Sequence, residues 1–293
     1  MKFDVRTILV PFDFSERCRA AAQHAVVLAK HFDADLELIH AIPYSSFEYS
    51  AFEGGSYVGS TWPNEDDIRS RLSEEIEKIE APVDAKANWK RTVVKGDPPR
   101  MIEEVAEARP GPLVVMPTHG YGRFRRFVLG SVTAKVLHDV NYPILTGAHL
   151  AEKPIFSEAP YRRVACAVDL REHSRATLEW AWSFTQSWSA ELFVVNAVNW
   201  LQTEPIESRL FTPELREQLI GGAREEMEQL VADVGCSAKV YADIEPIEKY
   251  VPSTATQADV LIIGRSLERG LLGRLREHSF NLIRESPCPV ISV

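Results

Sequence analysis

The sequence lacks the features that define several other classes of protein. Its four cysteines, Cys18, Cys166, Cys236 and Cys288, form no CxxC pair, so neither a zinc motif nor a redox motif is indicated. Lone cysteines of this kind usually behave as small buried hydrophobic residues. No stretch approaches the roughly 18 apolar residues of a transmembrane helix, and the amino terminus has no signal-peptide core. We therefore expect a cytoplasmic protein that does not enter membranes.

The sequence has no excess of basic charge. The chain has 33 Lys and Arg residues against 42 Asp and Glu residues, which gives a net charge of -9. A protein of this charge is repelled by polyphosphate surfaces and anionic lipid, so we expect no nucleic-acid partner. The histidines show neither HxxxH nor HExxH spacing, and no metal site is predicted.

An internal repeat organises the chain. At a prior of about 150 residues per domain, 293 residues suggest two domains. The segment that starts at Ile8 aligns without a gap with the segment that starts at Val164, which pairs Asp13 with Asp169. We read a duplicated domain, with copies at residues 1–150 and 161–293 and a polar join between them.

Each copy alternates short apolar runs with longer amphipathic stretches, which is typical of parallel strands buried by crossover helices. In the first copy we predict strands at Thr7–Phe12, Asp35–Ile42, Trp89–Val94, Leu113–Met116 and Ile144–Thr146. Helices are expected at Glu16–His31, Glu65–Ile79, Pro99–Ala108 and Val132–Asp139, the last with Ser131 as N-cap. In the second copy strands are expected near Val164, Leu192, Ala238, Val260 and Val290, with a helix at Pro213–Val231. The pattern predicts an α/β fold of two tandem, doubly wound (Rossmann-like), five-stranded parallel sheets.

Ligands of such sheets bind beyond the carboxyl ends of the strands, where Asp13 follows the first strand. Asp13 is equally compatible with a ligand role and with starting the following helix. After the fourth strand, Gly120, Gly122 and Gly130-Ser131 would let backbone N–H groups approach an anion, and Arg123 adds positive charge. The alternative is an exposed glycine-containing loop with solvated arginines. No GxxxxGK[ST] motif is present, so a P-loop is excluded.

These residues resemble the universal stress protein family. ILVPFDFSE supplies the first family element, and THG with nine residues before GSV supplies the glycine pattern that nucleotide-binding members carry. The resemblance spans both copies and implies the strand order 3-2-1-4-5. It also implies bound ATP, or ADP or AMP, with Mg²⁺ on the phosphates. The implied binding residues are Phe12, Asp13, Ala41, Met116, Pro117, Gly120, Arg123, Gly130, Ser131 and Val132.

Two positions depart from the family pattern in the first copy. Pro117 replaces a glycine and has no N–H to donate, which costs about 1 kcal/mol, or roughly fivefold in affinity. Phe12 is bulkier than a binding cleft needs and could either stack on a base or obstruct it.

The second copy departs further from the pattern. Arg276-Glu277 stands where the first copy has Gly130-Ser131, and Leu267 replaces the first copy's Gly120. A glutamate there would repel phosphate and the side chains would fill the space that glycine leaves open, so we predict that this copy binds no ATP by this mode. The resemblance implies a structural role for it, with the two copies paired through their last strands and a further dimer of chains left open.

Other segments have two interpretations each. Residues 43–64 carry aromatic side chains and form either a lid over the cleft or a surface flap. The acidic run Glu74, Glu75, Glu77 and Glu80 is most simply a solvated helix face, whereas Trp180, Trp182, Phe184 and Trp188 are expected to pack in the core.

Three functions follow from these observations. The first is a nucleotide-binding regulatory or stress-response protein with its site in the first copy. The second is an interaction module of the same fold that binds no nucleotide because Pro117 and Phe12 close the site. The third is a slow ATP hydrolase, for which the sequence supplies no paired carboxylates and no Ser-His-Asp spacing, so we expect no dedicated enzyme.

Overall fold

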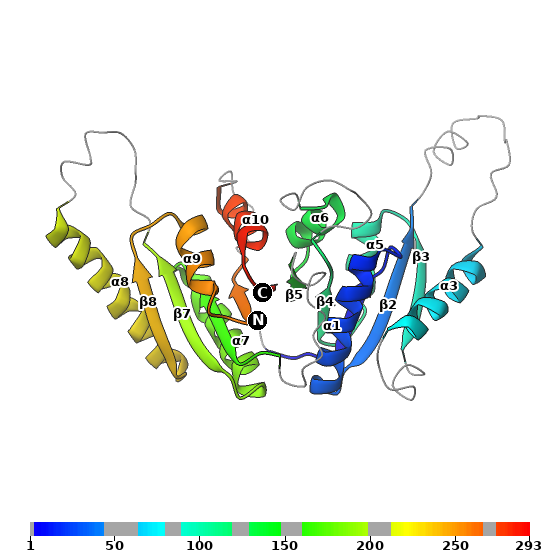
Figure 1. The fold of residues 1–293 in the computed structure, drawn as a ribbon, viewed down its shortest axis with the longest axis horizontal. Coiled ribbons are helices and arrows are strands. Elements are labelled where there is room, and N and C mark those ends of the chain that lie inside the picture. Colours follow the sequence, from blue (N-terminus) through cyan, green and yellow to red (C-terminus); the bar gives the residue numbers. More distant parts are fainter. Residues whose placement is uncertain are drawn as a thin grey trace. The chain divides into compact units, whose positions relative to one another are not determined.

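The computed structural model describes residues 3–43, 64–79, 89–118, 129–147, 160–198, 212–265 and 274–293, and side chains within 274–278 are not described. The chain divides into two compact units (Figure 1). The N-terminal unit is Asp4–Ile155, and the C-terminal unit is Phe156–Val293 together with Met1–Phe3. The aromatic stretch at 44–63 lies outside the described residues, so its two interpretations stay open.

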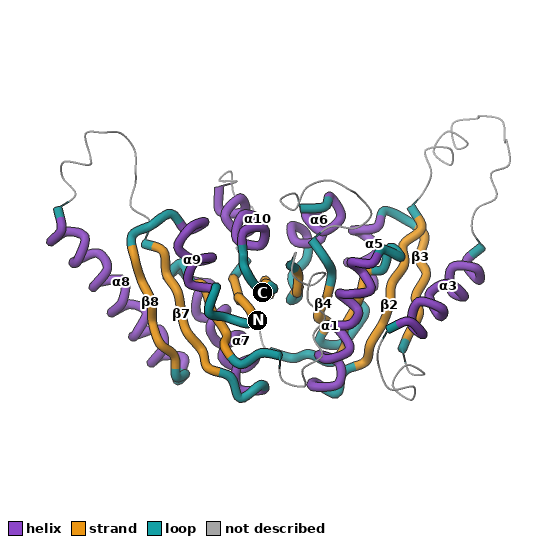
Figure 2. The backbone as a smooth tube through the Cα atoms, viewed as in Figure 1, coloured by secondary structure: helices purple, strands orange, loops and turns teal. Residues whose placement is uncertain are grey.

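The N-terminal unit alternates strands and helices along its whole length (Figure 2). Its elements are β1 (Thr7–Pro11), α1 (Glu16–Phe32), β2 (Asp35–Ile42), α3 (Glu65–Lys78), β3 (Lys90–Lys95), α5 (Pro98–Glu107), β4 (Pro112–Val115), α6 (Ser131–Asp139) and β5 (Ile144–Thr146). All pairings are parallel, in the order β3-β2-β1-β4-β5. Because the chain runs outward from β1 and then returns to β4, right-handed crossovers place α1 and α3 on one face and α5 and α6 on the other.

The C-terminal unit repeats this arrangement. Its elements are β6 (Arg163–Ala167), α7 (Glu172–Ser187), β7 (Glu191–Ala197), α8 (Pro213–Val234), β8 (Ala238–Asp243), α9 (Ile247–Ala255), β9 (Val260–Ile263), α10 (Arg274–Glu285) and β10 (Val290–Ser292). The parallel strand order is β8-β7-β6-β9-β10. The predicted α/β class, with two doubly wound parallel sheets, is therefore confirmed.

Each sheet forms a core because its central strands are apolar on both faces. Ile8, Leu9 and Val10 of β1 are fully buried, as are Val114 and Val115 of β4. Parallel strands covered by helices on both sides need such continuous apolar runs, and this is why the runs were visible in the sequence. In the part of the chain that the structure describes, no helix combines the length and the apolar character needed to cross a bilayer.

Three of the four aromatic residues expected in the core of the C-terminal unit are buried, whereas the fourth, Trp182, is half-buried. Trp180, Phe184 and Trp188 are buried along α7, and Tyr161 lies edge-on to Phe184 with ring centroids 5.3 Å apart. Phe3 reaches the same cluster, with its ring centroid 5.1 Å from that of Trp180. The amino-terminal end of the chain therefore contributes a side chain to the core of the C-terminal unit.

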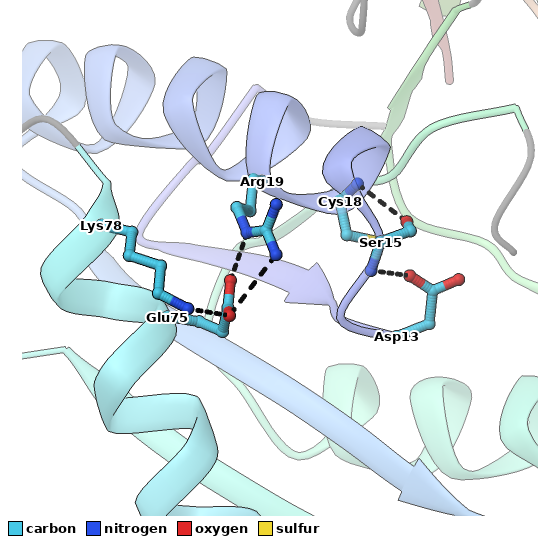
Figure 3. Close-up of polar contacts among 6 residues, drawn as sticks. All are labelled: Asp13, Ser15, Cys18, Arg19, Glu75 and Lys78. Atoms are coloured by element: carbon cyan, nitrogen blue, oxygen red, sulfur yellow. Dashed lines mark hydrogen bonds and ion pairs between the residues drawn. The ribbon is translucent and has the colours of Figure 1, made fainter.

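The acidic run on α3 is a solvated face only in part. Glu74 and Glu77 are exposed, as predicted, and Glu80 lies outside the described residues. Glu75 is only 7% exposed, and its carboxylate pairs with Arg19 of α1 and with Lys78 at 2.7 Å (Figure 3). Burial alone would raise the pKa of Glu75, but hydrogen bonds from Arg19 and Lys78 lower it below its ordinary value. The solvated-face interpretation is thus wrong for Glu75, because this residue joins α3 to α1.

Gly111 is required where the chain enters β4. Its φ is +49°, and a Cβ would lie 2.7 Å from the carbonyl oxygen of Asp4. The C-cap Gly235 is also left-handed, at φ +70°, but a Cβ there meets nothing within 4 Å.

We expect Gly111→Ala to lower the free energy of unfolding of the N-terminal unit by about 2 kcal/mol, through strain and overlap together. Gly235→Ala, the matched control, should cost its own unit about 1 kcal/mol from the left-handed backbone alone. Hydrogen exchange, followed separately in peptides of the two units, measures both effects. Equal losses of unfolding free energy in the two variants would contradict the prediction, because they would show that the overlap of the new Cβ with Asp4 costs no stability.

Candidate functional site

The candidate site lies at the carboxyl ends of β1, β2 and β4. Asp13 follows β1, Met116 and Pro117 follow β4, and Ala41 lies near the end of β2, paired with Val94. Because β1 pairs in parallel with both β2 and β4, these residues share one edge of the sheet. This edge is where doubly wound sheets bind their ligands.

The turn after β1 uses Asp13 to start α1. The Ser15 N–H donates to Asp13 Oδ1 at 2.9 Å, and the Ser15 hydroxyl accepts from the Cys18 N–H at 3.2 Å (Figure 3). Phe14 between them has a φ of 67°. These contacts support the helix-start interpretation of Asp13, while its contact with a ligand stays a prediction.

The Cys18 thiol beside this turn is buried and stays protonated. Burial, together with the negative charge of Asp13, raises the pKa of Cys18 to about 12. A thiolate is the nucleophilic form of cysteine, so Cys18 is unsuited to nucleophilic chemistry at neutral pH. It fills space beneath the site, as predicted for lone cysteines.

Phe12 packs inside the unit. Its side chain is 3% exposed, and its ring lies edge-on to that of Phe14 with centroids 5.6 Å apart. Its carbonyl oxygen lies 2.7 Å from His40 Nδ1. The ring therefore packs in the core of the unit. The described residues support neither of the two roles expected for it, stacking on a base or obstructing the base.

An arginine that sequence reasoning missed also reaches this turn. The guanidinium carbon of Arg71, on α3, lies 4.3 Å from the centroid of the Phe14 ring, a cation-π geometry. The Phe14 ring is also 4.8 Å from that of His40. Only the packing of α3 brings Arg71 here, since the residue lies far from Asp13 in the sequence.

The start of α6 is held against the end of β4. The Gly130 N–H donates to the Thr118 carbonyl at 2.7 Å, and the Thr133 hydroxyl donates to the Pro117 carbonyl at 3.1 Å. Gly130 is the N-cap, with φ -63° and ψ 147°, and Ser131 is the first helical residue. The prediction of Ser131 as N-cap is therefore wrong by one position.

This correction bears on the chemistry of the site. Gly130 has no side chain to accept a hydrogen bond from the first turn of α6, unlike Ser15 in α1. The start of a helix carries N–H groups without partners in the helix and a partial positive charge, both of which favour an anion. Ser131 is exposed and Val132 half-buried. Gly120 and Arg123, the other predicted phosphate contacts, lie outside the described residues.

The C-terminal unit has the same turn after β6. Asp169 Oδ1 accepts from the Arg171 N–H at 3.1 Å and from the Ser174 hydroxyl at 2.8 Å, and Leu170 has a φ of 59°. A cavity of about 540 Å³ opens beside this turn, at the carboxyl ends of β6 and β9. Among the residues whose side chains the structure describes, the lining carries the carboxylates of Asp169 and Glu172 and one arginine, Arg171.

The described part of this second site is thus open rather than filled. Gly264 lies at its edge, and a Cβ there would meet the Thr177 hydroxyl at 2.5 Å, so this glycine permits close packing of β9 on α7. Leu267 and the side chains of Arg276 and Glu277 lie outside the described residues. The expectation that side chains fill the phosphate end therefore remains a prediction.

Within the ranges that the structure describes, no group of three His, Cys, Asp or Glu side chains is placed to hold a metal ion.

Comparisons with known proteins agree with the repeat. The model of the family described as "Universal stress protein family" matches residues 4–146 and 160–293. The Universal stress protein MJ0531 of Methanocaldococcus jannaschii is 29% identical over 140 residues, which are 48% of this chain and 80% of that protein.

Solved structures resemble the chain as well. A universal stress protein from Archaeoglobus fulgidus has a TM-score of 0.64 at 18% identity, covering 99% of this chain and 96% of its own. A universal stress protein solved in complex with cAMP covers 45% of this chain and 96% of its own, at 20% identity and a TM-score of 0.32. At 18% identity the likeness to the Archaeoglobus fulgidus protein shows the fold alone.

Proposed function

The chain belongs to the universal stress protein family, and on that premise we propose that its N-terminal unit binds an adenine nucleotide in a regulatory or stress-response role. The observation that carries the proposal is the side-chain-free cap of α6. Gly130 is fixed beside the end of β4 by its hydrogen bond to Thr118, and the amides that follow it belong to Ser131 and Val132. A phosphate group matches this arrangement of donors.

The rest of the nucleotide would extend from the phosphates along the strand ends. Asp13 would contact the nucleoside and the backbone of Ala41 would lie by the adenine, as the family resemblance implies. Mg²⁺ prefers phosphate oxygens and water to an all-protein cage, so it would arrive with ATP or ADP. Pro117 offers no N–H and its carbonyl is already used by Thr133, so we expect weaker binding than with a glycine at this position.

We propose that the C-terminal unit does not bind the phosphates of a nucleotide. Its cavity carries two carboxylates, from Asp169 and Glu172, against one arginine. Like charges raise the cost of placing a polyphosphate beside them. These two carboxylates have counterparts in Asp13 and Glu16 of the N-terminal unit, so the proposed difference between the units rests on Arg276-Glu277, which stand where the N-terminal unit has Gly130-Ser131.

Binding should appear as stabilisation of the folded chain. At free nucleotide about a hundredfold above its dissociation constant, a ligand that binds only the folded state adds about 2.7 kcal/mol. We expect millimolar ATP with Mg²⁺ to slow hydrogen exchange in β1, β4 and α6, with no change in β6 and β9. AMP and ADP, tested alongside, identify the preferred species, and inorganic triphosphate controls for binding of phosphate alone.

An unchanged exchange pattern with all three nucleotides would contradict the proposal. The chain would then be an interaction module of the same fold that binds no nucleotide, as the packed Phe12 and the missing N–H of Pro117 would allow.

A further inference from the structure

The two sheets differ at matching positions near the amino ends of their strands. In the N-terminal unit Glu37 on β2 is in register with Lys90, and Thr92 follows two residues later on β3. In the C-terminal unit Phe193 on β7 is in register with Lys239, so Phe193 and Tyr241 take the places of Glu37 and Thr92. A buried carboxylate and its hydroxyl partner are thus replaced by two aromatic rings.

These two rings line a small pocket. It lies on the face of the sheet that α9 covers; Figure 1 shows α9 beside β7 and β8. We call it the aromatic pocket; it has a volume of about 250 Å³ and is lined by Phe193, Tyr241, Tyr250, Ser253, Thr254 and Gln257. At about 30 Å³ per water molecule this is room for roughly eight waters. A small organic group therefore fits inside.

The walls of the aromatic pocket are well-formed. The rings of Phe193 and Tyr241 stand nearly perpendicular, at 88°, with centroids 5.9 Å apart. Tyr241 is 41% exposed, more than the other large hydrophobic side chains among the described residues. The face of an aromatic ring carries partial negative charge and attracts cations.

The hydroxyl groups of the pocket present acceptors. Ser253 Oγ donates to the Tyr250 carbonyl at 2.8 Å, and Thr254 Oγ1 donates to the same carbonyl at 2.9 Å. Each hydroxyl has one proton, so both oxygens keep only lone pairs for a further partner. A ligand with N–H donors suits them better than a carboxylate or a phosphate.

The charges around the pocket are compatible with a positively charged ligand. The six lining residues carry no charge of their own at neutral pH. Lys239, the basic residue in register with Phe193, has its ammonium group 3.9 Å from the Glu191 carboxylate. The lining itself places no cation against an incoming positive group. Of the charged side chains that act on Tyr250, Asp243 and Glu245 are acidic and Arg224 is basic.

From these features we propose that the aromatic pocket binds a small organic cation with N–H donors, of the alkylguanidinium or alkylammonium class. Its π faces would attract the charge, and the oxygens of Ser253 and Thr254 would accept the N–H groups. The pocket lies at the amino ends of the strands, whereas Asp13 and Asp169 follow carboxyl ends. It is therefore separate from the proposed nucleotide site, and its test does not depend on that site.

The test is a titration of the full chain with methylguanidinium at constant ionic strength, followed by NMR or calorimetry. We expect saturable binding that weakens about fivefold to tenfold in Tyr241→Ala, because one exposed cation-π wall is lost. Tyr241→Phe keeps the ring face and should bind like the parent. Tyr241→Ala also removes the ring contact with Phe193 and should lower the melting temperature modestly, whereas Tyr241→Phe keeps the contact and should keep the parent's melting temperature. Both titrations are therefore run well below the lower melting temperature.

Methylurea, which has a similar shape and no charge, is the matched ligand control. The proposal requires it to bind at least tenfold more weakly than methylguanidinium. Equal binding of the two ligands would make the pocket a neutral slot and overturn the proposal. Equal binding of methylguanidinium to the parent and to Tyr241→Ala would also overturn it, as would no binding by the parent.

Discussion

Replacing Arg109 by Leu is expected to destabilise the N-terminal unit by about 3–5 kcal/mol, because it leaves a buried carboxylate without its main partner. Glu37 is 1% exposed. Arg109 donates two hydrogen bonds to the Glu37 carboxylate, from Nε to Oε2 at 2.6 Å and from Nη2 to Oε1 at 2.9 Å. Thr92 donates to the same carboxylate, and Lys90 lies 3.6 Å away.

The matched control is Arg100→Leu on the nearby helix α5. Arg100 pairs with Glu104 at 2.8 Å, but both side chains are at least half exposed. Exposed pairs at this spacing contribute about 0.3–0.5 kcal/mol. Hydrogen exchange in β1 and β4 reports the free energy of unfolding, and comparable losses in the two variants would show that the Glu37 pair is as weak as a surface pair.

The stability lost in Arg109→Leu should become smaller as the pH falls. Burial raises the pKa of Glu37, but the hydrogen bonds from Arg109 and Thr92 reverse this and hold it below its ordinary value. A carboxyl group with a lowered folded-state pKa stabilises the fold above its unfolded pKa of about 4.3, and this contribution is lost as the pH falls. The gap between the parent and Arg109→Leu should therefore narrow below about pH 4, and a gap that widens there would contradict the assignment.

Gly130→Val is expected to weaken nucleotide binding by at least about a hundredfold, or to abolish it. The backbone of Gly130, at φ -63° and ψ 147°, is one that valine adopts readily, so the variant should fold. Its branched side chain would stand over the first amides of α6, where the phosphates are proposed to lie. The loss would come from excluded space and blocked donors, not from unfolding.

Glu277→Ala is the control in the C-terminal unit and should leave affinity unchanged, since that unit is not expected to bind phosphate. Calorimetric titration with ATP and Mg²⁺ measures both variants, and circular dichroism checks their folding. If both bind as tightly as the parent, the phosphate contacts have been assigned to the wrong loop.

Much of the fold was accessible from the sequence because its signals are local. Apolar runs predicted the bounds of β2 and β5 without error, and β1 and β3 within one residue. The repeat paired Asp13 with Asp169, and the structure adds that both carboxylates accept a hydrogen bond from the N–H two positions later.

Contact between distant segments accounts for most of what the sequence did not show. Glu75 was predicted to be solvated on its helix, yet it is buried and paired with Arg19 of another helix. The pairing of Glu37 with Arg109 and the approach of Arg71 to Phe14 depend on how helices pack against the sheet and its turns. Periodicity does not report such contacts. The shift of the α6 cap from Ser131 to Gly130 is a one-residue effect at a helix boundary, where sequence signals are least sharp.

The measurement that tests the central claim most directly is the number of nucleotides bound per chain. Equilibrium titration of the full chain with ATP and Mg²⁺ should give one site, and that site should disappear in Gly130→Val. A count of zero in the parent, or of two with one surviving in that variant, would contradict the assignment of nucleotide binding to the N-terminal unit alone.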